Sequence, residues 1–221
     1  MMNNFLLFFW REWLLLRRGG GQLLLAIFFW VSGFFLLSLF LLPLTTLVPT
    51  DKMLVVTSLL LLLLFFSLVG HGGAAYRADM AMGLLPDIIL SGRSVLAFIY
   101  GKWLAIFIFA GLPLWLLNGI GFYFFALPFD MYVFLSFLLF VAHASLLINF
   151  LSSMLKSNER GDGNLLMVVV LVPLLIPCFL LVLLSLTERQ GGHILALQAA
   201  YFLFMLALLP PAAAFIISRE M

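Results

Sequence analysis

The chain has 221 residues, of which 66% are apolar and only 9% carry a charge. About a quarter of the residues in a soluble globular protein are charged, because they cover its water-exposed surface. The composition therefore excludes a soluble enzyme, and a net charge of +2 is too small for a nucleic-acid-binding surface. The one cysteine, Cys178, excludes an internal disulfide.

The first 22 residues have a pattern of their own. Apolar residues recur at helical spacing on one side, and Arg11 and Arg18 lie on another. The apolar side consists of Phe5, Phe8, Phe9, Trp13 and Leu16. The pattern predicts a helix over 1–22 that lies along the inner membrane surface. The alternative is an ordinary positively charged anchor.

Uncharged apolar stretches long enough to cross a bilayer, which takes roughly 20 residues, fill the rest of the chain. Six are expected to be spans: 23–48, 53–70, 95–117, 131–155, 165–186 and 194–217. Every acidic residue lies outside them. The sequence thus predicts an all-α polytopic membrane protein, with one six-helix domain over 23–221.

Lysines and arginines are distributed unequally about these spans. Only Lys52 and Arg189 fall on one side, and the other cations gather on the side of the termini. The positive-inside rule therefore predicts that both termini are cytoplasmic. Lys102 lies about two turns into the third span, and we expect its ammonium to reach the cytoplasmic surface.

The segment after the third span is rich in aromatic residues. Asn118 and Gly119 predict a turn, and the aromatic residues over 122–132 predict a belt at the outer interface, with a re-entrant segment as the alternative. In the fifth and sixth spans, Pro173 and Pro177 and the pair Pro210–Pro211 predict kinks. Packing alone would also explain these prolines.

No constellation of residues predicts catalysis or metal binding. Of the three histidines, only His143 falls inside a span, where it is a candidate haem ligand or relay; a hydrogen bond to a neighbouring helix explains it as well. The Gly101–Lys102 pair lacks the rest of a phosphate-binding loop. We therefore expect a chain that is not an enzyme, and any ATP would be used by a partner subunit.

The cytoplasmic loop over 71–94 is longer than a turn between two spans requires. Its apolar residues recur at helical spacing from Tyr76 to Leu85, and Pro86 is expected to end that helix. A short helix parallel to the membrane could seat in a groove on a cytoplasmic partner and carry motion to the two spans that it joins. The alternative is an amphipathic loop resting on the headgroups.

Several short motifs resemble the haem exporter protein B family, the membrane permease of cytochrome c maturation. The first group is Tyr76-Arg77, Asp79, Gly83, Leu85, Leu90-Ser91 and Lys102, and the second is Leu171-Val172-Pro173-Leu174, Ile176-Pro177 and Leu209-Pro210-Pro211-Ala212-Ala213-Ala214. The chain departs from that family's pattern at Met82 and Gly92, where the family has Asp and Pro, and at 70–75, where acidic residues are missing.

The resemblance implies an ABC transporter permease of the ABC-2 type in the bacterial inner membrane. It implies a separate ATPase subunit, a haem-handling membrane partner, a haem chaperone and a homodimer within the complex. ATP hydrolysis would be tied either to haem delivery, with haem as the cargo, or to release of the haem-loaded chaperone. The residues implied to couple to the ATPase are Tyr76, Arg77, Asp79, Gly83 and Leu85. A lipid or drug exporter of the same architecture and a non-transporting scaffold for assembly factors are the alternatives.

Overall fold

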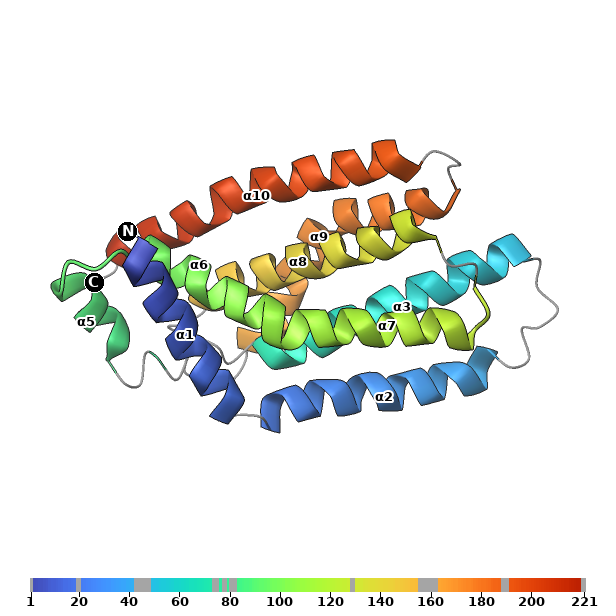
Figure 1. The fold of residues 1–221 in the computed structure, drawn as a ribbon, viewed down its shortest axis with the longest axis horizontal. Coiled ribbons are helices and arrows are strands. Elements are labelled where there is room, and N and C mark those ends of the chain that lie inside the picture. The colour runs from blue at the N-terminus through green and yellow to red at the C-terminus, as the bar shows by residue number, and fades with distance from the viewer. Residues whose placement is uncertain are drawn as a thin grey trace.

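The computed structural model describes residues 2–18, 21–41, 49–72, 76, 79, 83–127, 130–154, 163–187 and 191–219. These residues form an all-α bundle (Figure 1), as predicted. The helices are α1 (Met2–Arg18), α2 (Gly21–Leu41), α3 (Pro49–Gly72), α5 (Leu84–Leu90), α6 (Val95–Ile106), α7 (Leu112–Phe124), α8 (Met131–Met154), α9 (Gly163–Thr187) and α10 (Gly191–Arg219). A π-helical segment, η2 (Phe107–Gly111), joins α6 to α7.

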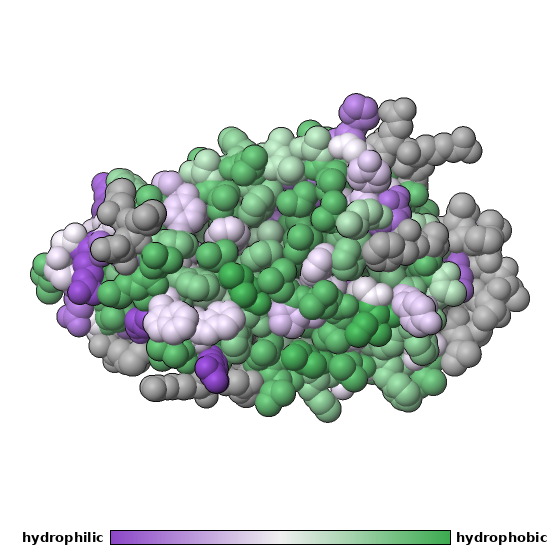
Figure 2. All heavy atoms as spheres, in the orientation of Figure 1, coloured by the Kyte–Doolittle hydropathy of each residue, from purple (hydrophilic) through white to green (hydrophobic). Residues whose placement is uncertain are grey.

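Six of the helical segments are long and apolar enough to cross a membrane, as expected. They lie at Leu23–Phe40, Asp51–Val69, Val95–Phe124, Met131–Ser153, Val169–Leu186 and Gly192–Arg219. Large apolar side chains cover the outside of the bundle, including Phe28 and Phe40, which are 72% and 79% exposed. Hydrophilic residues gather toward the two ends in Figure 2. Because water would penalise such a surface, the chain is a multi-pass membrane protein.

Helix α8 is the centre of the bundle and packs against α3, α6, α9 and α10. In the candidate span of α8, 67% of the residues are buried inside the protein. In the candidate span of α2, at the periphery, 11% are buried. The bundle places the start of α1, the end of α10 and α5 at one end of the molecule, and the C-terminal ends of α2, α7 and α9 at the other (Figure 1).

The third candidate span is longer than predicted, because no turn forms at Asn118–Gly119. The chain stays helical to Phe124, and Asn118 is buried within the bundle. In an apolar environment a helix satisfies the backbone groups that a turn would expose, so the turn propensity of Asn and Gly is overridden. The π-helical segment comes just before Pro113, which cannot donate to the carbonyl of Phe109.

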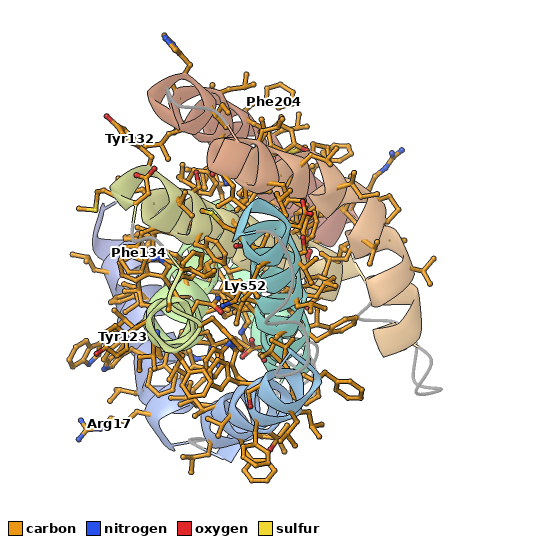
Figure 3. All side chains as sticks on the ribbon, turned by 90° about the vertical axis from the view of Figure 1, so that its right-hand side faces the viewer. Arg17, Lys52, Tyr123, Tyr132, Phe134 and Phe204 are labelled. Atoms are coloured by element: carbon orange, nitrogen blue, oxygen red, sulfur yellow. The ribbon has the colours of Figure 1, made fainter. Side chains whose placement is uncertain are left out.

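Aromatic side chains are exposed at the end opposite the termini. Tyr123 and Tyr132 project outward there (Figure 3), and Tyr123 is 89% exposed. The Trp115 indole N–H donates to the carbonyl of Phe134 (3.0 Å), which ties α7 to α8. Because α7 continues as a regular helix up to these residues, their placement favours the aromatic belt over a re-entrant segment.

Both proline pairs lie inside continuous helices, Pro173 and Pro177 in α9 and Pro210 and Pro211 in α10. Pro210 cannot donate to the carbonyl oxygen of Leu206, four residues earlier, and the Tyr100 hydroxyl of α6 donates to that oxygen instead (2.9 Å). A neighbouring helix thus replaces the missing hydrogen bond. Bending at these prolines stays a prediction.

Candidate functional site

Helix α1 packs along α6 rather than standing apart from the bundle. The two helices come close at Gly101, where an added Cβ would lie 3.0 Å from the backbone nitrogen of Phe9 and 3.2 Å from the Cβ of Phe8. Trp13 extends the contact through an edge-to-face packing with Phe109, with ring centroids 5.6 Å apart. The N-terminal segment is therefore an integral part of the bundle as well as an amphipathic helix.

Four charged side chains meet where α1, the loop and α6 converge, and we call Arg11, Glu12, Asp79 and Lys102 the ionic ring. The Arg11 guanidinium donates to Glu12 Oε1 (2.6 Å) and to Asp79 Oδ1 (2.8 Å). The Lys102 ammonium donates to Glu12 Oε2 (2.9 Å) and also to Asp79 Oδ2. Each carboxylate thus bridges both cations, and the ring is closed and has no net charge.

The ionic ring is largely withdrawn from solvent. The Lys102, Asp79 and Glu12 side chains are 3%, 2% and 6% exposed, and Arg11 is 25% exposed. The expectation that the Lys102 ammonium reaches the surface is therefore wrong. Two carboxylates from other segments neutralise the ammonium inside the protein, so it gains nothing by extending to the headgroups.

Aromatic rings surround the Lys102 ammonium. Its Nζ lies 4.9 Å from the centroid of the Tyr76 ring and 5.3 Å from that of Phe98, distances at which a cation and a π system attract. Phe8 of α1 packs edge-to-face on Phe98, with centroids 5.4 Å apart. The same three segments that contribute charges therefore also share an apolar contact.

Tyr76 connects the loop to the central helix. Its hydroxyl donates to Asn149 Oδ1 of α8 (3.1 Å), and Asn149 Nδ2 donates to the carbonyl of Ile99 in α6 (3.2 Å). Burial, together with the nearby charges of Glu12 and Asp79, raises the pKa of the Tyr76 hydroxyl well above its ordinary value. The hydroxyl therefore stays protonated and remains a donor to Asn149.

Helix α5 begins at Leu84 and carries Pro86 in its first turn, so the prediction that Pro86 ends the helix is wrong. A proline is tolerated there because the first backbone N–H groups of a helix have no partner within it. Gly83 precedes the helix at φ +67°. Gly92 follows it at φ +66°, where it donates to the carbonyl of Ile89. Proline could not adopt that φ, whereas glycine adopts it without strain.

The candidate coupling residues are divided by this arrangement. Tyr76, Asp79 and Leu85 are buried against the body of the protein, and Arg77 lies outside the described residues. The exposed side of α5 carries Leu90, which is 85% exposed. A docking partner at this end of the molecule would meet that side, whereas the buried residues hold the loop in place.

His143 is fully buried in α8 and packs face to face on Tyr201 of α10, with ring centroids 4.6 Å apart. Phe202 covers a further side at 6.0 Å. Neither ring nitrogen has a hydrogen-bond partner among the described residues, so the alternative of a hydrogen bond to a neighbouring helix is wrong, and stacking takes its place. The described residues contain no group of three His, Cys, Asp or Glu side chains placed to hold a metal ion.

Sequence reasoning did not identify Glu12 and Asn149 as site residues. Glu12 is the single acidic residue of the first 50. Its position among the apolar residues of an amphipathic helix is a signal that could have identified it as a site residue. Its partner Lys102 is 90 residues away along the chain, and no periodicity reports such a pairing. Neither a scan against protein-family models nor a search of curated proteins finds a match to this chain.

Proposed function

We propose that this chain is the permease subunit of an ABC transporter, driven from the side of its termini by a separate ATPase. Haem delivery, or release of a haem-loaded chaperone, in cytochrome c maturation is the process that the sequence resemblance favours. The complex would hold two copies of the chain in the bacterial inner membrane. A haem-handling membrane protein and a haem chaperone would act with it.

The observation that carries the proposal is the way the loop between α3 and α6 is held. The loop contributes Asp79 to the ionic ring and Tyr76 to the bond with Asn149, so it is tied to α1, α6 and α8 at once. Because these ties are buried and charge-assisted, displacement of α5 would be transmitted to the spans and not absorbed by the loop.

The exposed face of α5 suits a protein partner. It offers Leu90 beside the charged residues Asp87 and Arg93, all of them exposed. In this proposal Leu90 inserts into an apolar pocket on the partner, and the flanking charges form the polar rim of the contact. In this scheme the chain works by changing conformation. The bends expected at the prolines of α9 and α10 would let the spans change shape.

Co-purification with an ATPase tests the docking part of the proposal. We expect the wild-type chain to retain an ATPase subunit from its host, identified by mass spectrometry. Leu90→Asp should lower that retention at least about tenfold, because it places a charge in the partner's pocket. Tyr123→Asp adds the same charge to an exposed residue at the opposite end and should leave retention unchanged.

Recovery of no ATPase by the wild-type chain, or equal recovery with Leu90→Asp, would contradict the proposal. Substitution of Asp79 is a poor test of docking, because it would break the ionic ring and disturb the fold as well. The proportion of each variant in the membrane fraction shows whether insertion is intact.

A deletion strain separates the candidate cargoes. Loss of c-type cytochromes supports haem delivery, whereas normal cytochromes with altered export of a lipid or drug support the alternative exporter. A partner ATPase that binds but cannot hydrolyse ATP distinguishes a transporter from a scaffold. The phenotype of the deletion should reappear with that inactive partner, and normal cytochrome assembly would favour the scaffold.

A further inference from the structure

A hollow lies at the end of the molecule that carries the termini, where α5 ends, α6 begins and α10 ends. Its volume is about 460 Å³. The apolar part of its wall includes Leu96, Ala214 and Phe215, and Arg93 and Ser218 contribute polar groups. The hollow is separate from the ionic ring and shares no residue with it.

One arginine in the wall of the hollow and a second that stacks near its wall residue Phe215 are available to bind an anion. Arg93 is exposed, and Arg219 lies directly after Ser218 with its guanidinium carbon 5.9 Å from the Phe215 ring centroid. The ion pairs formed by the described residues include neither arginine, nor do they include Asp87 of α5. Both guanidinium groups therefore keep their hydrogen-bonding capacity for a ligand.

The position of the hollow identifies the chemistry of the ligand. The candidate span that includes α6 begins at Val95 and that of α10 ends at Arg219, so we infer that the hollow lies at the level of the headgroups. Phe215 in its wall is 65% exposed and faces the lipid side of α10. A ligand that satisfies both parts must carry an anionic group on an apolar chain.

We propose that this hollow binds an anionic phospholipid, with its phosphate at Arg93 and Arg219 and the upper part of an acyl chain along Leu96, Ala214 and Phe215. A free phosphate ion would satisfy the arginines and leave the apolar wall uncovered. Because the hollow adjoins α5, the bound lipid would brace the loop on its membrane side.

Native mass spectrometry of the purified full chain tests the site with phosphatidylglycerol and phosphatidylcholine of the same acyl chains. The wild-type protein should prefer phosphatidylglycerol. Replacing both arginines, Arg93→Gln with Arg219→Gln, should lower that preference by about fivefold for each residue. Arg17→Gln removes an exposed arginine that projects from α1 (Figure 3) and is not part of the hollow, and it should change nothing.

Ala214→Trp keeps both arginines and fills the apolar part of the hollow. It should weaken phosphatidylglycerol binding at least fivefold, and millimolar inorganic phosphate should not displace the lipid from the wild-type protein. An undiminished preference in the double arginine variant would overturn the proposal. Unchanged binding by Ala214→Trp would also overturn it, because it would reveal attraction by surface charge alone, and displacement by phosphate would reveal a site for the free ion.

Discussion

At the scale of single residues, the ionic ring is held together by its equal numbers of positive and negative charges. Moving a charge out of water costs several kcal/mol, and the ring offsets this cost by giving every charge two opposite neighbours. Such an arrangement tolerates the loss of one charge of each sign better than the loss of a single charge. The ring therefore predicts a smaller loss of stability for a paired substitution than for a single one.

Lys102→Met should lower the free energy of unfolding by about 3–5 kcal/mol, because Glu12 and Asp79 would be left buried with one cation between them. Adding Asp79→Asn should restore more than half of that loss, since the remaining Arg11–Glu12 pair is neutral. Unfolding by SDS in mixed micelles measures both variants.

Lys52→Met is the control for these variants. Lys52 forms none of the ion pairs found among the described residues, so its loss should change the free energy of unfolding by less than about 1 kcal/mol. Equal stability of Lys102→Met and the wild type would show that the ring does not hold these segments together.

The sequence alone singled out Tyr76 and Asp79, through a resemblance, but gave no indication that both side chains are buried. Burial depends on which distant residues meet, and neither Glu12 nor Asn149 is near the loop in the chain. Leu90 is exposed instead, and its apolar character in the sequence gave no sign that it lies outside the core.

At the scale of helices, the contact between α1 and α6 depends on a missing side chain. Gly101→Ala would place a methyl group 3.0 Å from the backbone nitrogen of Phe9, which cannot move without shifting α1. We expect a loss of about 1–3 kcal/mol in unfolding free energy. Trypsin should also cleave after Arg11 faster in the variant, as α1 separates from the bundle.

Gly192→Ala provides the comparison for Gly101→Ala. Its methyl group would meet Tyr132 at 3.8 Å, an ordinary contact, so the substitution should be neutral or slightly stabilising through better helix propensity. Similar behaviour of the two alanine variants would show that close approach at Gly101 does not limit how α1 packs.

The contact between α6 and α10 depends on the Tyr100 hydroxyl and on Pro210. Tyr100→Phe should cost about 1 kcal/mol, because the carbonyl of Leu206 would lose its donor. In a Pro210→Ala background the same change should cost much less, since alanine at position 210 supplies the backbone N–H. A double-mutant cycle of unfolding free energies measures this coupling, and strict additivity would contradict the explanation.

Helices that cross a membrane were the most predictable elements, because length and apolar composition define them without reference to their neighbours. Their ends were harder to predict. The helix runs through Asn118 and Gly119 because a bilayer penalises open backbone, and α5 begins where Pro86 was expected to end a helix. The first error comes from applying the turn preferences of soluble proteins to a membrane span, and the second from taking as a helix end a proline that lies in the first turn of a helix.

At the scale of the whole molecule, one end carries the termini, α5 and the ionic ring, and the other carries the exposed aromatic residues (Figure 1). The ring joins segments from the beginning and the middle of the chain, so this end is the more highly connected one. The uneven distribution of cations predicts that it faces the cytoplasm.

Labelling with a membrane-impermeant maleimide tests that orientation. In a Cys178→Ala background, Ser91→Cys should react in inverted vesicles and not in intact cells, and His193→Cys should show the reverse. Both positions are exposed, and they lie at opposite ends of the bundle. Reaction of Ser91→Cys from outside the cell would invert the topology and remove the basis for a cytoplasmic ATPase.

The closed ring also sets an order of events during biosynthesis. Glu12 is translated 90 residues before its lysine partner, whereas Asp79 is translated only 23 residues before the same lysine. The first helix is thus made before the site that receives it exists. Its final seating is a late step, and a nascent chain halted before residue 102 would carry an amphipathic helix that still rests on the membrane surface.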